Sequence, residues 1–199
     1  MTENILFADY TDRGRDAALQ ALVALDAAHD AGSLKLREAR VIRRDEDGDV
    51  EVPGEVDHTY DSAGFAVGGV VGALVGLLGG PVGVLIGFGA GGLIGGAQDA
   101  RRVIETNTAL EELTAGIPPG STVLVAEAAE DSTTPADQAL GSGVRRYEAA
   151  KVRADLEEAL KAAEAGSERG SGADSERGSG AGSGREDSGG EPSPPTRRE

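Results

Sequence analysis

Several groups of residues in this chain have the types and spacings that chemistry requires. The run Asp45-Glu46-Asp47-Gly48-Asp49 contains the acids and the glycine of a calcium-binding loop. The run Gly87-Phe88-Gly89-Ala90-Gly91-Gly92 matches the G-x-G-x-x-G pattern that cradles a pyrophosphate. His58 could relay protons or sense pH, and Ser132–Thr134 supply hydroxyl groups that a base would have to activate.

The first two motifs lack the context that their chemistry needs. A calcium loop requires a glutamate six residues after its glycine, and Gly54 stands there instead, so we expect a solvated hairpin turn. A dinucleotide site requires an acid at the end of the next strand, about 20 residues on. That strand ends near Glu127, 38 residues past Gly89. We therefore predict neither a metal site nor a cofactor.

The remaining candidates have ordinary structural explanations. His58 lies between polar residues and also fits an exposed loop, and His29 lies near a predicted helix C-terminus, where an imidazolium is favourable. No base is close in sequence to Ser132–Thr134. Without cysteine the chain has no disulfide or thiol chemistry, and a net charge of -16 argues against nucleic-acid binding. We expect no catalytic residue and no enzyme activity.

Two stretches of globular composition, residues 1–61 and 99–165, predict the two halves of one α+β domain. The first half is predicted to contain a strand at Ile5–Ala8, a helix at Arg15–Ala31 capped by Asp12 and ended by Gly32, and a hairpin of Ala39–Arg43 with Val50–Val52. The second half is predicted to contain a helix at Asp99–Ala115, a strand at Thr122–Ala126, a weaker strand at Val144–Tyr147 and a helix at Lys151–Ala165. This order favours a ferredoxin-like small sheet with helices on one face.

Residues 62–98 separate the two halves and contain no charged residue over 37 positions. The glycines recur at intervals of four, and residues four apart share one face of a helix. Gly79-Gly80-Pro81 divides the segment into two halves of about 18 residues, which predicts a glycine-zipper helical hairpin. The predicted helix-packing and oligomerisation residues are Gly64, Gly68, Gly72, Gly76, Gly80, Gly83, Gly87, Gly91 and Gly95.

The surroundings of this hairpin decide its stability. Each glycine costs about 1 kcal/mol relative to alanine in a helix interior, so an isolated hairpin in water should not be helical. Lipid could enforce the helix, because each half would span about 27 Å of a hydrocarbon core roughly 30 Å thick. An oligomer in which hairpins bury one another could enforce it as well. Arg101 and Arg102 would place both termini in the cytoplasm if the hairpin inserts.

Residues 166–199 form a region of different composition. They contain no Leu, Ile, Val, Phe, Tyr or Met, and Ser-Glu-Arg-Gly-Ser-Gly-Ala occurs twice, at Ser167–Ala173 and Ser175–Ala181. A segment without apolar surface to bury cannot offset its ordering entropy, so we predict a disordered tail.

Residues 1–165 resemble a bacterial domain of unknown function, number twelve sixty-nine, catalogued as an uncharacterised membrane protein. The likeness lies in Ile5–Asp9, Val41–Gly48, the Ser62-Ala63-Gly64 start of the hairpin and the Pro119–Thr122 turn. A related group of general stress proteins shares the layout. The resemblance implies an α+β domain with an inserted helical hairpin, and it implies no activity and no catalytic residues.

Two functions are favoured, and an enzyme or nucleotide binder whose site the sequence hides is a third, less favoured hypothesis. The first is a non-enzymatic protein of the cell membrane that contacts lipid and self-associates through the hairpin, with a stress or envelope role implied by the resemblance. The alternative is a cytoplasmic, soluble homo-oligomer whose hairpins bury one another and which binds a small ligand or a protein.

Overall fold

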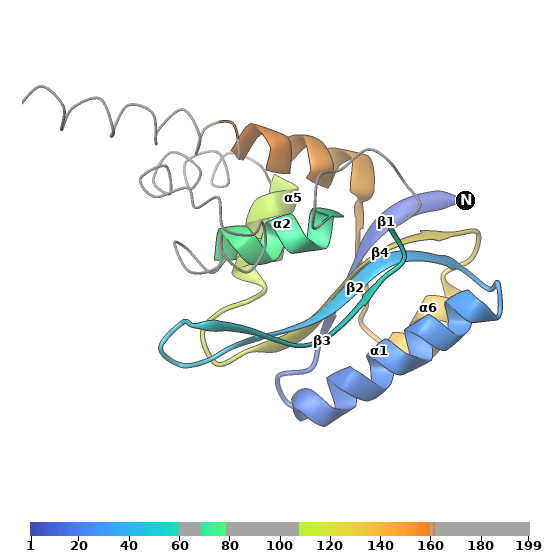
Figure 1. Ribbon diagram of the computed structural model, residues 1–199, viewed down its shortest axis with the longest axis horizontal. Coiled ribbons are helices and arrows are strands. Elements are labelled where there is room, and N and C mark those ends of the chain that lie inside the picture. The colour runs from blue at the N-terminus through green and yellow to red at the C-terminus, as the bar shows by residue number, and fades with distance from the viewer. Residues whose placement is uncertain (60–68, 79–107, 160, 162–199) are drawn as a thin grey trace, which may run out of the picture.

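The computed structural model describes residues 1–59, 69–78, 108–159 and 161 (Figure 1). In chain order the elements are β1 (Thr2–Asp9), α1 (Gly14–Asp30), β2 (Lys35–Arg44), β3 (Val50–Asp57), α2 (Gly69–Leu78), α5 (Thr108–Ala115), β4 (Thr122–Glu130), α6 (Thr134–Leu140), β5 (Arg145–Glu148) and a helix over 149–159. The α+β class is confirmed. The strand and helix positions of the first half agree closely with the sequence prediction, although both hairpin strands are longer.

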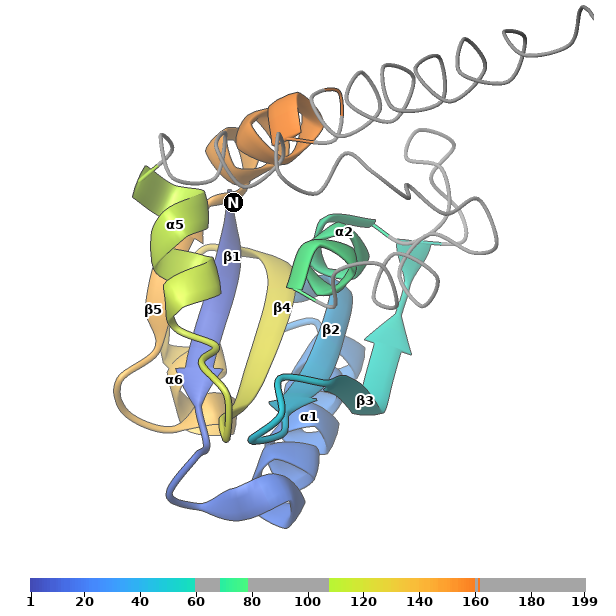
Figure 2. The same cartoon turned by 90° about the vertical axis from the view of Figure 1, so that its left-hand side faces the viewer.

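The five strands form one antiparallel sheet in the order β3-β2-β4-β1-β5, which Figure 2 shows across the view. Both β1 and β2 pair antiparallel with β4, so they run parallel to each other on either side of it. Without β3, α2, α5 and the last helix, the order of strands and helices is that of a ferredoxin-like β-α-β-β-α-β unit. The strand β3 extends this unit at one edge.

Helices cover both faces of the sheet, and the prediction of helices on one face is wrong. Helices α1 and α6 pack on one face, and α2, α5 and helix 149–159 pack on the other (Figure 1). The reason lies in β4, because all nine of its residues are buried. A strand that is buried on both faces requires a layer of apolar cover on each side.

Local sequence explains the boundaries of α1 and shows one further error. The buried residues Ala18, Leu22 and Leu25 recur at helical spacing and face the sheet. Gly32 ends the helix with a φ of 70°, as predicted. Asp12 does not cap the helix, because the N-cap is Arg13 and backbone hydrogen bonds from Arg13 and Gly14 to Tyr10 close the preceding turn.

Helix α6 was missed by the sequence analysis. Its seven residues begin at Thr134-Pro135 and are followed by Gly141, which has a φ of 89°. Proline in the first turn and glycine after the last turn are typical helix boundaries, but seven residues are too few to show a helical period. Contact with α1 places this short helix on the sheet.

Part of the predicted hairpin is described, and it is a helix in the core. Helix α2 contributes Val70, Val71, Leu74 and Val75 to the apolar cluster above the sheet. The predicted second half of the hairpin and the tail from 166 lie outside the described residues. No helix in the described ranges combines the length and the apolar character that crossing a bilayer requires.

Leu74→Ala tests whether α2 is a working part of the core. Leu74 is 1% exposed, so we expect its truncation to lower the free energy of unfolding by about 2–5 kcal/mol. Val23→Ala on α1 is the control, because Val23 is 69% exposed and its truncation should change stability by no more than about 0.5 kcal/mol. Urea denaturation gives both values, and equal midpoints for the two variants would contradict the packing of α2.

Candidate functional site

A bulge in β2 places two glutamates directly opposite each other in the centre of the sheet. Leu36 pairs with Ala128, but Glu38 pairs with Glu127, so Arg37 is the extra residue of the bulge. The side chains of Glu38 and Glu127 are 1% and 2% exposed. Asp57 lies opposite Glu38 on the other side, in β3. Like charges in such positions repel each other, so this carboxylate row of Glu38, Glu127 and Asp57 needs compensation.

Arginines on two elements compensate Glu127. The Nε atom of Arg37 lies 3.2 Å from Glu127 Oε1 without the alignment of a hydrogen bond, so this pair is coulombic. From helix 149–159, Arg153 donates a hydrogen bond to the same oxygen and another to Glu3 Oε2 at 3.1 Å. Burial lowers the pKa of Arg153, but the two carboxylates outweigh burial and raise that pKa above its ordinary value. Glu127 therefore ties helix 149–159 to the sheet as an ion pair.

Glu38 is compensated by a helix instead. Its Oε1 atom accepts a hydrogen bond of 2.8 Å from the backbone N–H of Val71, in the first turn of α2. The first N–H groups of a helix have no partner within the helix, and the N-terminal dipole favours a negative group there. The strand thus supplies from a distance the acceptor that a local N-cap residue usually supplies.

The compensation of Glu38 is incomplete. Its Oε2 atom is buried and has no hydrogen-bond partner among the described residues. Burial raises the pKa of Glu38 to about 7, because the opposing effects of the Val71 N–H and of Arg40 are too small to offset it and the carboxylates of Glu127 and Asp57 add to it. This carboxyl group therefore changes charge near neutral pH.

A glycine allows α2 to begin against this carboxylate. Gly69 has a φ of 53°, and a Cβ atom at this position would overlap the carboxylate of Glu38. One turn later, a Cβ at Gly72 would overlap the guanidinium of Arg40. Both glycines thus face charged side chains of the sheet, so this part of α2 is occupied within the same chain.

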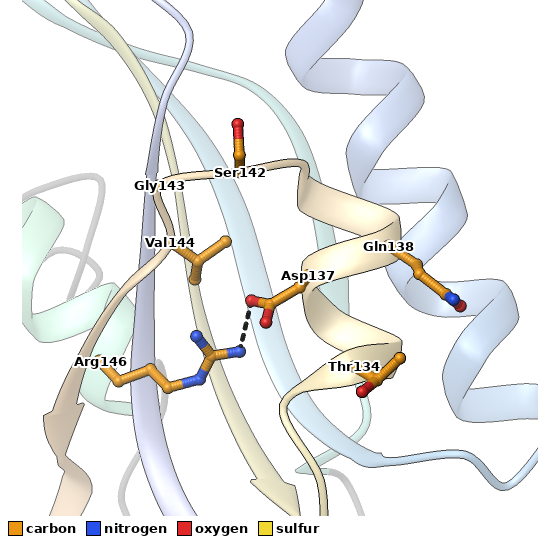
Figure 3. Close-up of a pocket in the computed structure, with 7 residues that line it drawn as sticks. All are labelled: Thr134, Asp137, Gln138, Ser142, Gly143, Val144 and Arg146. Atoms are coloured by element: carbon orange, nitrogen blue, oxygen red, sulfur yellow. Dashed lines mark hydrogen bonds and ion pairs between the residues drawn. The ribbon is translucent and has the colours of Figure 1, made fainter.

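The surface carries a separate pocket of about 500 Å³ beside α6 (Figure 3). The Arg146 guanidinium at its edge lies 2.8 Å from Asp137 Oδ1 and 2.6 Å from Glu130 Oε1. Burial lowers the pKa of Arg146, but these carboxylates outweigh it and raise the pKa. Its positive charge is therefore already matched, and the remaining polar groups of the pocket suit a small neutral polar ligand. These groups are the Thr134 and Ser142 hydroxyls and the Gln138 amide.

The two histidines, 29 residues apart in sequence, form a stacked pair. The ring centroids of His29 and His58 are 4.2 Å apart. His58 Nε2 lies 2.8 Å from Asp26 Oδ1, and His29 Nδ1 accepts a hydrogen bond of 3.1 Å from the Leu36 backbone N–H. The pair thus connects the end of α1 with the beginning of β2 and the residue after β3. Sequence reasoning had considered the two histidines separately.

The other sequence candidates have the following positions. The acidic run Asp45–Asp49 is a hairpin turn, as expected, in which the Asp49 N–H donates to Asp45 Oδ1 at 2.8 Å and Gly48 has a φ of 95°. Within the described ranges no cluster of His, Asp or Glu could hold a metal ion. The Ser132 hydroxyl donates a hydrogen bond to the Thr134 hydroxyl at the beginning of α6.

Among the predicted packing glycines, Gly76 is buried in α2. The dinucleotide-like run Gly87–Gly92 and the predicted packing residues Gly64, Gly68, Gly80, Gly83, Gly87, Gly91 and Gly95 lie outside the described residues.

The sequence analysis missed the carboxylate row. A signal was present, because Glu127 interrupts the otherwise apolar run Val123–Ala129, in which every residue of the strand is buried. Glu38 gave no such signal, since it lies among Arg37, Arg40 and other charged residues typical of an exposed strand. Its burial depends on the bulge and on α2, and neither can be located from local pattern.

Comparison with protein-family models, with curated protein sequences and with solved structures finds no match for this chain. The resemblance to the domain of unknown function therefore stays a prediction from the sequence motifs of this chain.

Gly69→Ala tests the contact between α2 and Glu38. An alanine in the left-handed region costs about 1–2 kcal/mol, and Gly14→Ala, at a φ of 79° with open space around it, should show that cost alone. We expect Gly69→Ala to cost about 1–3 kcal/mol more, because displacing the carboxylate leaves the Val71 N–H unsatisfied. Thermal or urea unfolding of both variants measures the difference, and equal destabilisation would argue against the contact.

Proposed function

We propose that this chain is a non-enzymatic protein that self-associates through its uncharged segment, residues 62–98, and that the α+β domain anchors one end of this segment. The observation that carries the proposal is the position of α2. The helix lies in the uncharged segment, is apolar throughout, and is fixed to the sheet at its first turn by Glu38. The domain thus fixes residues 69–78 of the segment in place.

The absence of enzyme activity is part of the proposal. The described carboxyl group with the strongly raised pKa, Glu38, lies under α2 and lines neither the pocket beside α6 nor the neighbouring depression of about 320 Å³ between α1 and α6. A catalytic acid or base must reach a substrate. The buried ion pairs of Glu127 and Glu130 are best explained as supports for helices and strands.

The energy of α2 bears on the choice between water and lipid as the surroundings. Burying the four Val and Leu side chains that α2 contributes to the core cluster stabilises the docked helix by roughly 6–12 kcal/mol as an upper range. Inserting the fifteen Leu, Ile, Val and Phe residues of the whole segment into a bilayer would provide roughly 4–9 kcal/mol. These values overlap, so insertion does not clearly outweigh docking, and we favour self-association with α2 docked.

Membrane association is the second candidate function, and the uninterrupted run of 37 uncharged residues favours it. The ten residues of α2 span about 15 Å, roughly half of a hydrocarbon core. A docked α2 therefore cannot be part of a complete span, and lipid contact would be made by residues after Leu78 or after release of α2. Both termini would lie in the cytoplasm in this arrangement.

Leucine substitutions in the glycine series test self-association. Gly87→Leu and Gly91→Leu would fill the predicted groove, and we expect each to reduce cross-linking and the mass measured by analytical ultracentrifugation. The matched control is Gly89→Leu, in the same run but about 200° away around a helix. Gly72 is unsuitable because it contacts Arg40 within the chain. Equal effects at positions 87 and 89, or none at 87 and 91, would contradict packing through one glycine face.

Fractionation of cells that contain the untagged protein separates the two surroundings. A membrane-inserted segment should remain in the pellet through a carbonate wash, because its hydrophobic contacts with lipid do not depend on charge. We expect the docked oligomer to leave the pellet. Flotation with lipid vesicles provides a second measurement, in which Leu85→Asp should abolish co-flotation of an inserted protein. Retention after the wash, together with this loss, would reject the aqueous oligomer in favour of lipid.

A further inference from the structure

Glu38 has the geometry of a group whose charge is coupled to the position of a helix. Helix α2 contains no charged residue, and its described attachment consists of apolar packing and of the hydrogen bond from the Val71 N–H to Glu38 Oε1. The side chain of Glu38 is 1% exposed beneath it. Release of α2 would therefore bring this carboxyl group into contact with water.

The charged groups around Glu38 come from three elements. On β2, Arg40 favours the ionised form, but its Nε atom also binds Glu55 Oε2 at 3.1 Å. On β4, the Glu127 carboxylate opposes the ionised form. The nearby Arg37 of β2 and Arg153 of helix 149–159 already form ion pairs with Glu127. On β3, Asp57 opposes it as well. The helix itself contributes a backbone N–H and its N-terminal dipole.

The hydrogen bonds suit the neutral form of the group. A buried carboxylate needs donors for both oxygens, and Glu38 Oε2 has none among the described residues. A neutral carboxyl group needs a donor only for its carbonyl oxygen, which Val71 provides at Oε1. The neutral group also carries no charge that its buried surroundings would disfavour.

We propose that Glu38 is a proton-binding site coupled to α2, in which the neutral carboxyl group favours the docked helix and loss of the proton favours release of the helix. The inference does not depend on the proposed function, because docking can be measured on the protein alone, without lipid. It adds a regulatory property, since the exposure of α2 becomes dependent on pH.

The direction of the pH dependence follows from the two states of the group. Burial raises the pKa of Glu38 to about 7 when α2 is docked, whereas its ordinary value is 4.5. A raised pKa in the docked state means that docking is most stable below the ordinary value and loses stability as the pH rises through about 7. The ratio of released to docked helix should therefore increase by up to tenfold per pH unit between about 5 and 7, and level off above 7.

Hydrogen exchange of the α2 amides, followed by NMR between pH 5 and pH 8, tests the proposal on the full chain. The protection factors, corrected for the intrinsic pH dependence of exchange, should fall by up to tenfold per unit up to about pH 7. They should also be smaller than those of β4, because release of the helix requires less than global unfolding. Protection equal to that of β4, or independent of pH, would overturn the proposal.

Two variants identify the group responsible. Glu38→Gln keeps an acceptor for Val71 and cannot ionise, so we expect high α2 protection that no longer changes with pH. Glu130→Gln is the matched control, because Glu130 is a carboxylate of similar burial that pairs with Arg146, and its loss should preserve the slope of the natural protein. A slope that persists in Glu38→Gln would overturn the assignment.

A direct titration keeps the test decisive even if Glu38→Gln does not fold. The carbon-13 resonance of the Glu38 carboxyl group in the unmodified protein should titrate with a midpoint within about one pH unit of 7. A midpoint near the ordinary value of 4.5 would show that the docked helix does not perturb the group, and the proposal would fail.

Discussion

Strand β4 is buried along its whole length, and the need to cover both of its faces determines most of the architecture. Helices α1 and α6 cover one face, as in an ordinary ferredoxin-like unit. The other face is covered by α2, α5 and helix 149–159, which lie on either side of the segment 79–107 or follow β5. Residues 69–78 of the uncharged segment are thus part of the core, and α2 is a structural element of the domain.

Charge is present in this core because Glu127 occupies one position of the otherwise apolar, fully buried middle of β4. A buried carboxylate must be paired, and Arg153 and Arg37 supply the pairing. The bulge at Arg37 then brings Glu38 opposite Glu127, where Arg40 acts on Glu38 only through its charge and no described arginine donates a hydrogen bond to it. The N-terminus of α2 fills that role, so the same carboxylate row fixes two helices by two different kinds of interaction.

This arrangement changes the interpretation of the glycines. A period of four predicted a groove for another helix. At Gly72, which belongs to this series, the group that approaches is the side chain of Arg40 from the same chain, and at Gly69, outside the series, it is the side chain of Glu38. Gly72 is therefore not free to pack against another copy while α2 is docked. A helical face without side chains indicates that another group packs closely against it. The sequence does not show whether that group is a backbone or a side chain.

The sequence by itself determined the elements with strong local signals. The apolar run at Ile5–Ala8, the helical spacing of Ala18, Leu22 and Leu25, and the Asp-Gly turn at Asp47-Gly48 each specify their structure through neighbours within a few residues. The tertiary structure alone decided that helices cover both faces, that Glu38 is buried opposite Glu127, and that His29 meets His58. These features depend on strand register and on contacts between distant residues, whose energies local periodicity does not contain.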